Sequence, residues 1–330
     1  MTNTLFQTKF AGLELSSPII IGSSGLTNSV EKNKELEKAG AGALVLKSLF
    51  QEQMTRQRPK PCPAGKDVEH PSPEWHIHNC LDNNRISDYL HLIQETKQQC
   101  QIPVIASINC YKEGAWIDFA HQIERAGADA IELNIFSLNT EKDTPNDLIE
   151  NSYLQIMQKV KEAVSIPVIV KMSKYFSHLV NMASKLKEAG VAGIVLFNRL
   201  FQPDINMNTL QVSSGSLFST PAELTDTLRW TSIINGRLPE ISLASGTGIH
   251  DWEDIAKCIL SGASAVEICS TVYLHGNEII ATMKRSLEEW MTGLNIHSIS
   301  EIQGRLNYKE ISNAPVYERS QFIKYFSNRD

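Results

Sequence analysis

One unit recurs along this chain and limits what it can fold into. A charged, helix-like stretch ends in a small residue and a glycine, and a short β-branched segment follows at once. The copies are EKAGAGALVLKS (37–48), ERAGADAIELNI (124–135), KEAGVAGIVLFN (187–198) and LSGASAVEICST (260–271). The glycine stands where a helix end favours positive φ, and the apolar run after it is typical of a parallel strand that is covered on both faces. The unit therefore predicts helices alternating with parallel strands.

Further apolar segments at 17–24, 102–109, 166–173 and 240–248 complete the pattern. The predicted strands then start near 18, 42, 103, 130, 167, 193, 240 and 265, with amphipathic stretches between them. Eight strands alternating with helices favour an α/β fold of the (β/α)8 TIM-barrel type. We expect one domain over 1–330, with 276–330 as a closing helix and C-terminal tail. A doubly wound sheet with a separate cap domain is the alternative, although no linker or composition shift divides the chain.

Composition excludes several classes of protein. The chain has 31 Lys+Arg against 37 Asp+Glu, a net charge of −6, which gives no basic footprint for nucleic acid. No apolar run is long enough to span a bilayer, and the amino end MTNTLFQTKF lacks the apolar region of a secretory signal, so we expect a cytoplasmic protein. The 6 cysteines contain no CxxC pair, which argues against a disulfide scaffold or a cysteine-ligated metal.

Two intervals between predicted strands are long. The excursion after the second strand is rich in proline and histidine, and the excursion after the sixth contains FQPDINMNTLQVSSGSLFST. Both follow the carboxyl ends of strands, where barrel enzymes build their active sites. His70, His76, His78 and Cys80 lie in the first excursion without a supporting carboxylate pattern, so we predict no metal site there.

Polar residues interrupt the apolar strands near their carboxyl ends. They come from the second to sixth predicted strands: Lys47, Asn109, Asn134, Lys171 and Asn198. Burying such a group without a partner is costly, so we expect a shared ligand at the barrel mouth. Two lysines and three amides favour an anion and can recognise an amide or imide edge. No metal-binding carboxylate cluster is expected at these strand ends, so the pattern indicates chemistry based on a cofactor rather than a metal.

Loops after the last two strands provide a candidate phosphate site. Gly246 and Gly248 lie in the SGTGI loop after the seventh strand, and Ser270 and Thr271 follow the eighth. Backbone N–H groups of these loops form the usual phosphate site of such barrels. Gly215 in the second excursion, and Ser23, Ser24 and Gly25 after the first strand, could also allow close approach to a ligand.

Ser137 and Asn139 lie just beyond the fourth strand, in NIFSLN. A structural reading makes them a helix cap and a turn residue. A functional reading places Ser137 over the ligand as a proton acceptor, a role for which the hydroxyl needs help from a neighbour or from water.

Together these segments resemble the FMN-dependent dihydroorotate dehydrogenases, and most closely their soluble class 1 form. The resemblance covers most of the chain, through TKFAGLELSSPIIIGSSG, GALVLKS, ELNIFSLN, PVIVKMSKYF and ISLASGTGIHDWEDIAKCILSGASAVEICST. It implies that the enzyme oxidises dihydroorotate to orotate in pyrimidine biosynthesis and forms a homodimer. Proton abstraction by residue 137 from C5 of the substrate would accompany hydride transfer from C6 to the flavin.

The resemblance also assigns residues. Those implied for FMN are Ser23, Ser24, Gly25, Lys47, Ser48, Asn109, Asn134, Lys171, Gly215, Gly246, Gly248, Ser270 and Thr271. Those implied for the substrate are Lys47, Asn83, Asn134, Asn139 and Asn198, with Ser137 and Lys47 as catalytic residues. Lys171 would lie near the pyrimidine edge of the flavin and stabilise its anionic reduced form.

The chain departs from the soluble class in three places. Ser137-Leu138 replaces the usual Cys-Pro, Arg199 replaces a hydroxyl residue after the sixth strand, and Met-Ser follows Lys171. Serine is the base in the membrane-associated class. The departures leave open another cyclic amide or dihydropyrimidine as substrate, a non-catalytic paralogue, and the electron acceptor, which could be fumarate, a quinone or an electron-transfer subunit.

Overall fold

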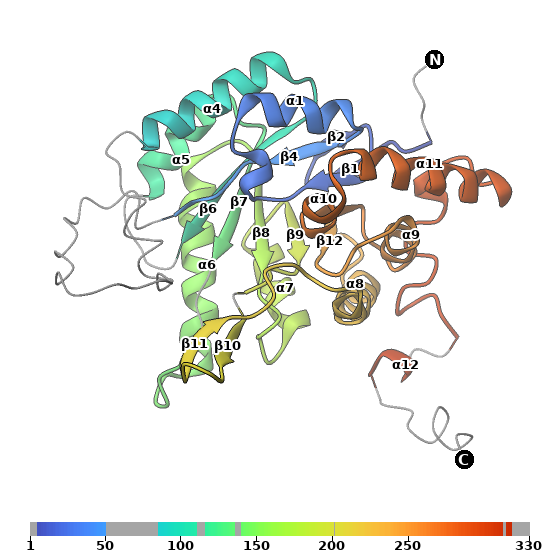
Figure 1. The fold of residues 1–330 in the computed structure, drawn as a ribbon. Helices are drawn as coiled ribbons and strands as arrows, with labels where there is room; N and C mark the ends of the chain where they lie inside the picture. Colours follow the sequence, from blue (N-terminus) through green and yellow to red (C-terminus); the bar gives the residue numbers. More distant parts are fainter. Residues whose placement is uncertain are drawn as a thin grey trace.

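Eight parallel strands close into a barrel in the computed structural model, which describes residues 5–50, 85–110, 116–135, 140–200, 202–312 and 315–318 (Figure 1). In chain order the barrel strands are β3 (Ile19–Ile21), β4 (Ala43–Val45), β6 (Val104–Cys110), β7 (Ala130–Ile135), β8 (Val168–Met172), β9 (Gly193–Leu196), β12 (Leu243–Gly246) and β13 (Ala265–Ile268). The sheet order is β4-β3-β13-β12-β9-β8-β7-β6, and pairing of β4 with β6 closes it. The predicted (β/α)8 fold is therefore confirmed. A two-residue strand, β5 (Leu49–Phe50), continues the edge beyond β4 along β6.

Helices cover the outside of the barrel. They are α1 (Val30–Lys38), α4 (Arg85–Gln99), α5 (Trp116–Arg125), α6 (Asn146–Ala163), α7 (Leu179–Glu188), α8 (Leu224–Arg237), α9 (Trp252–Leu260), α10 (Ser270–His275) and α11 (Glu278–Gly293), while the short helix α12 (Pro315–Glu318) lies in the C-terminal tail, away from the barrel (Figure 1). Side-chain caps explain two of the starts: the Ser29 hydroxyl accepts from Lys32 N–H, and Asp251 and Asp254 form a capping box. No helix in these described ranges is long and apolar enough to cross a membrane.

The interior of the barrel has its own apolar cluster, distinct from the two clusters between strands and helices. Each barrel strand contributes at least one residue to it, such as Ile20, Ile105 and Ile169. A hairpin that the sequence analysis did not predict, β1 (Thr8–Phe10) with β2 (Leu13–Leu15), adds Phe10 and Leu15. Because Ala11 N–H bonds to Ser242, just before β12, this hairpin closes the amino end of the barrel.

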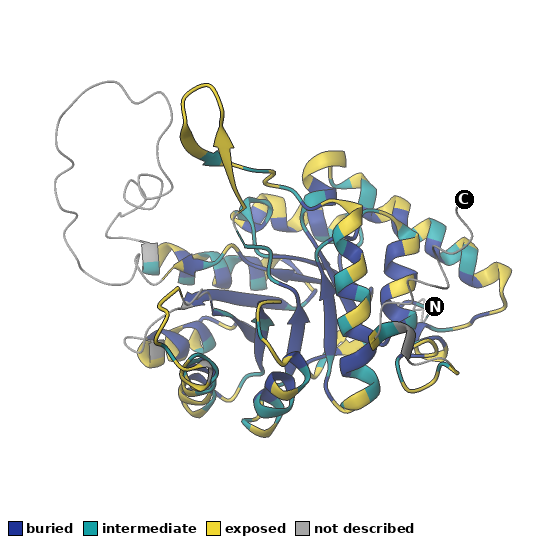
Figure 2. Cartoon of the chain, turned by 90° about the horizontal axis from the view of Figure 1, so that it is seen from below, coloured by how far each residue is buried: buried dark blue, intermediate teal, exposed yellow. Residues whose placement is uncertain are grey.

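The excursion after β9 contains a second unpredicted hairpin, β10 (Pro203–Asn206) with β11 (Gln211–Ser214). It extends away from the barrel, and Figure 2 shows it exposed while the barrel strands are buried. The η2 turn (Pro221–Glu223) then leads into α8. The excursion after β4 falls mostly at 51–84, outside the described residues, and so does the His70–Cys80 segment.

The region after β13 begins with α10 and the long helix α11, and most of 294–312 is irregular except for the η3 turn (Ile299–Glu301). This tail runs along α8 and α9. Leu306 N–H bonds to Leu260 O at 2.8 Å, and Tyr308 N–H bonds to Ser232 O at 3.2 Å.

Candidate functional site

Asn109, Asn134 and Lys171 lie side by side at the carboxyl end of the barrel. The register pairs Asn109 of β6 with Asn134 of β7, and Asn134 with Lys171 of β8. Each of them lies two or four residues after an apolar residue of the barrel interior on the same strand. Since every second side chain of a strand points to the same face, their side chains also point into the barrel. Asn198, just after β9, donates from Nδ2 to Asn134 Oδ1 at 2.6 Å. The predicted amides are thus brought together.

Lys171 is held by carboxylates from inside the barrel. Its Nζ contacts Glu267 Oε1 of β13 and lies 4.0 Å from Glu132 Oε1 of β7. The Lys171 side chain is 12% exposed, and both carboxylates are buried. A shared ligand was the expected partner of Lys171, and the barrel itself supplies two further partners, Glu267 and Glu132.

The cluster shifts its own proton equilibria. Burial alone would lower the pKa of Lys171, but Glu267 and Glu132 raise it above its usual value. Burial raises the pKa of Glu132 well above its usual range, and the nearby Glu267 raises it further. Burial also raises the pKa of Cys269, next along from β13, to about 12. Lys171 is therefore a cation and Cys269 a neutral thiol at neutral pH.

Hydroxyl groups form a chain at the ends of β3, β4 and β6. Ser48 N–H donates to Ser23 Oγ at 2.8 Å, and the two hydroxyls also bond at 2.8 Å. Ser48 Oγ bonds to Ser107 Oγ at 2.7 Å, and Ser107 N–H donates to the Tyr89 hydroxyl of α4 at 2.8 Å. Ser23 and Ser48 were predicted, and this network fixes both relative to the barrel wall.

The loops after β12 and β13 are tied to each other and to α8. Thr227 Oγ1 donates to the carbonyls of Gly246 and Thr247, at 3.0 and 3.1 Å. Thr271 is buried and its hydroxyl donates to Ile249 O at 2.5 Å, so it joins the two loops. Ser270 Oγ accepts from Ser219 N–H at 2.9 Å. The side chains of Thr271 and Ser270 therefore organise these loops.

The predicted glycines have separate reasons to be glycine. Gly248 has a φ of +85°, and a Cβ there would lie 2.7 Å from the Leu224 Cα at the start of α8. A Cβ on Gly215 would lie 3.0 Å from Gln202 O, and one on Gly25 would lie 2.8 Å from the Tyr273 hydroxyl. Gly246 would make ordinary contacts, the nearest at 3.6 Å. Packing within the protein thus accounts for Gly25, Gly215 and Gly248.

Lys47 and Ser24 lie at the rim. Lys47, two residues beyond β4, is exposed, so the expectation of a buried lysine there was wrong: the chain leaves the barrel wall before it. Ser24 caps the η1 turn (Gly25–Thr27), and its hydroxyl accepts from Leu26 N–H.

Arg199 is engaged by the excursion that follows β9. Its Nε lies 3.0 Å from Glu223 Oε1, and Nη1 donates to the carbonyls of Ser216 and Leu217 at 2.9 and 3.0 Å. This cation fastens the excursion to the start of α8, which gives it a structural role.

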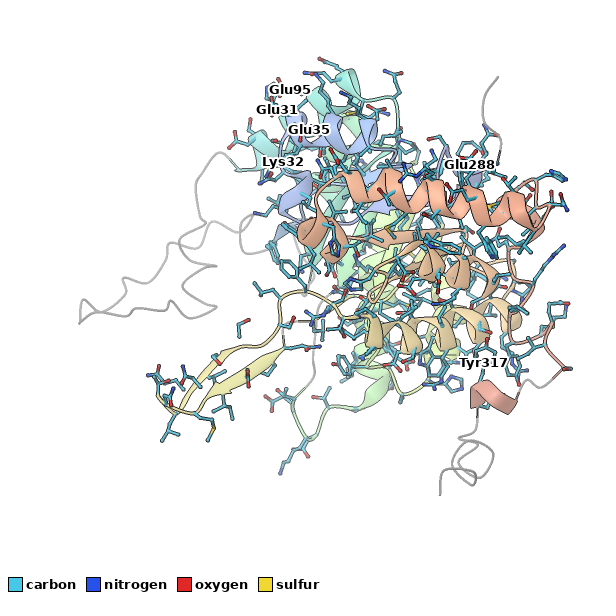
Figure 3. All side chains as sticks on the ribbon, turned by 45° about the vertical axis from the view of Figure 1, so that its right-hand side comes forward. Glu31, Lys32, Glu35, Glu95, Glu288 and Tyr317 are labelled. Carbon is cyan, nitrogen blue, oxygen red and sulfur yellow. The ribbon has the colours of Figure 1, made fainter. Side chains whose placement is uncertain are left out.

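Three predicted site residues, Asn83, Ser137 and Asn139, lie outside the described residues. Several residues at the site were not predicted, among them Tyr89, Ser107, Glu132 and Glu267. The two glutamates carried a signal, because each interrupts an apolar strand, in AIELNI and AVEICS. Figure 3 labels other carboxylates, on α1, α4 and α11, and they lie in the outer helix layer, away from this cluster.

Comparison with known proteins gives a family match. The family model described as dihydroorotate dehydrogenase matches residues 5–291. The chain is 26% identical over 306 residues to a putative dihydroorotate dehydrogenase A (fumarate) of Aeropyrum pernix, covering 89% of this chain and 95% of that protein. It is 26% identical over 309 residues to the catalytic subunit of a dihydroorotate dehydrogenase B (NAD(+)) of Thermoplasma volcanium, covering 90% and 97%. It is 27% identical over 267 residues to a dihydroorotate dehydrogenase A (fumarate) of Limosilactobacillus reuteri, covering 78% and 84%.

Proposed function

Since the chain belongs to the dihydroorotate dehydrogenase family of oxidoreductases, we propose that it binds FMN at the carboxyl face of its barrel and oxidises dihydroorotate to orotate. The observation that carries the proposal is the row Asn109, Asn134 and Lys171, with Asn198 bonded to it. Neighbouring amides and a cation suit the imide edge of a flavin, which presents both donors and acceptors. FMN supplies an acceptor for the hydride and its electron pair.

The other proposed FMN contacts fall into two groups. Ser23, Ser24, Gly25, Lys47 and Ser48 lie at the ends of β3 and β4, where the hydroxyl chain holds Ser48 beside the row of amides. Around the phosphate we propose Gly215, Gly246, Gly248, Ser270 and Thr271. The contacts of Thr227 and Thr271 support this. Thr227 of α8 binds the carbonyls of Gly246 and Thr247, and Thr271 binds the carbonyl of Ile249, so these carbonyls are already occupied within the protein.

For the substrate we propose contacts from Lys47, Asn83, Asn134, Asn139 and Asn198. Ser137 would accept the proton from C5 of dihydroorotate while its own hydroxyl proton passes to a neighbour or to water, and the hydride would leave C6 for the flavin, so that a C5–C6 double bond forms. The exposed ammonium of Lys47 is available to the substrate carboxylate. Arg199 is engaged by Glu223 and the excursion, so it gives no reason to prefer another substrate.

The electron acceptor and the oligomeric state are the remaining parts of the proposal. Relatives whose names specify fumarate or NAD(+) match this chain about equally well, so the acceptor follows from neither. We propose that the protein is a homodimer and that it acts in pyrimidine biosynthesis in the cytoplasm.

Anaerobic addition of dihydroorotate to the purified holoprotein tests the proposal. We expect a yellow protein whose visible flavin band bleaches. Ser137→Ala should retain the band and bleach orders of magnitude more slowly. Ser184→Ala, which removes a hydroxyl bonded to Glu188 on the exposed side of α7, is the matched control and should bleach as the wild type does. A colourless protein that takes up no FMN would refute the cofactor, and a yellow protein that does not bleach would refute the substrate.

A further inference from the structure

We propose that Glu132 and Glu267 share a single proton and together act as positioning residues that hold the Lys171 ammonium beneath the carboxyl face of the barrel. The inference about flavin rests on the proposed function, because it takes Lys171 as a flavin contact. The shared proton itself rests on contacts within this chain.

Two buried carboxyl groups that meet at one ammonium require a proton. Glu267 Oε1 contacts Lys171 Nζ, Glu132 Oε1 lies 4.0 Å from the same atom, and both glutamates are buried. An ionised carboxylate has acceptors alone, so two carboxylates at this separation repel, whereas a carboxylic acid donates to a carboxylate. Within the described part of the chain, Glu132 Oε1 and Glu267 Oε2 are buried without a hydrogen-bond partner. A proton between the groups supplies the donor that they lack.

Charge balance gives the same result. Two carboxylates and one ammonium would leave a net charge of −1 inside the barrel, and one added proton makes the cluster neutral. Net charge in a buried site is costly, whereas a paired and neutral cluster is tolerated. Glu267 contacts the ammonium directly and Glu132 lies 4.0 Å from it, so Glu132 is the group that carries the proton. The raised pKa of Glu132 agrees with this assignment.

The groups packed around the two glutamates do not change the net charge of the cluster. Tyr89, from α4, and Cys269, beyond β13, are titratable groups whose own pKa is raised by burial and also by the charge of Glu132. Both are therefore neutral at neutral pH. From β3 the neighbour is Gly22, where a Cβ would lie 2.9 Å from Glu267 Cγ and 2.8 Å from Cys269 Sγ. The glycine leaves the space that Glu267 occupies.

The arrangement fixes a flexible side chain. Lysine has a long stem with many rotamers, and carboxylates from β7 on one side and β13 on the other hold its Nζ. Because the cluster is neutral, replacing either glutamate by glutamine leaves its charge at zero: the remaining carboxylate ionises and pairs with Lys171. Replacing both leaves an uncompensated ammonium.

Infrared spectroscopy of the flavin-free protein at pH 7 tests the shared proton. We expect the wild type to show a protonated-carboxyl band that shifts in D2O, and Glu132→Gln and Glu267→Gln to lose it. Glu253→Gln, on the exposed surface of α9, is the control and should keep it. Absence of the band in the wild type, or its persistence in both single variants, would overturn the proposal. If one single variant fails to fold, the other carries the same prediction.

The pH dependence of unfolding provides a second readout without flavin. A carboxyl whose pKa is raised on folding stabilises the fold fully below its unfolded pKa of about 4.3, and that stability is lost as pH rises toward its folded pKa. Relative to Glu132→Gln, the unfolding equilibrium constant of the wild type should therefore rise by up to about tenfold per pH unit in that window. An unchanged ratio between pH 5 and 7 would count against the proton on Glu132.

The midpoint potential of bound FMN tests the positioning role. We expect Glu132→Gln and Glu267→Gln to stay close to the wild type and the double variant to shift upward, because a lone ammonium favours anionic reduced flavin. Upward shifts in both single variants would show that the wild-type cluster carries −1, which overturns the shared proton. Equal potentials in all four proteins would overturn the positioning role. A carboxyl band in a protein that binds no FMN would refute the proposed function and leave the shared proton standing.

Discussion

Removing the cation from the buried cluster should produce a large and pH-dependent loss of stability. Lys171→Met leaves Glu132 and Glu267 without their counter-charge, inside a barrel where both are buried. Deleting one partner of a buried ion pair costs about 3–5 kcal/mol, because an uncompensated charge stays behind. The loss is a large share of the roughly 5–15 kcal/mol by which folded proteins are stable.

The linkage between proton binding and folding predicts a loss of stability of the same size for Lys171→Met. In Lys171→Met the second carboxyl must also bind a proton, so its folded pKa rises above the unfolded value of about 4.3. A group with a raised folded pKa gives stability that is present below the unfolded pKa and lost as pH rises. At about 1.4 kcal/mol per pH unit, the loss should reach about 4 kcal/mol by pH 7 and be small near pH 4.

Urea unfolding of the flavin-free protein from pH 4 to 7 measures the effect. Lys257→Met is the matched control, because the Lys257 side chain is 46% exposed and its ion pairs should contribute about 0–1 kcal/mol. In the double variant Lys171→Met with Glu267→Gln, one carboxyl remains and can stay protonated. Part of the lost free energy of unfolding should therefore be regained. A cost for Lys171→Met no larger than that of the control, or independent of pH, would refute the reasoning.

Three further changes test other parts of the site. Gly22→Ala places a Cβ 2.8 Å from a cysteine sulfur and should cost about 1–3 kcal/mol in urea unfolding, whereas Gly293→Ala, with nothing within 4 Å, should be neutral. Thr227→Val removes a buried donor to two loop carbonyls, so it should cost about 1–2 kcal/mol of stability and weaken FMN binding, as measured by equilibrium dialysis. Thr225→Val is the control and should do neither, because Thr225 is exposed and its hydroxyl bonds within its own turn. Arg199→Met should speed proteolytic cleavage in 202–218 and leave the KM for dihydroorotate unchanged; a raised KM would show a direct role in binding.

The barrel could be predicted because its strands are covered on both faces. Such strands appear as short apolar runs, and the glycine before several of them marks the end of a helix. The hairpins could not be predicted on the same grounds. TKF and LEL are three-residue strands without an apolar run, and the β10–β11 hairpin has no buried residue, so neither has the pattern of a buried strand.

At the site, position along a strand was predictable and partnership was not. Asn109, Asn134 and Lys171 were correctly placed at one level, because parallel strands end at one face of the barrel. The period of two also places Glu132 on the same face as Asn134. Nothing in the order of residues pairs Lys171 with Glu267, which is 96 positions away and meets it because the barrel closes.

The interior of the barrel changes character from one end to the other, and this explains why charged groups are tolerated in it. The amino end is filled by apolar side chains and closed by the β1–β2 hairpin, which excludes water from below. The carboxyl end presents amides and hydroxyls. Glu132, Glu267 and Lys171 lie between these layers, where low polarity strengthens their mutual attraction and raises the cost of any unpaired member. A single proton on the glutamate pair keeps the attraction to Lys171 and leaves no charge of the cluster unpaired. The lysine is then held rigidly and is fully charged.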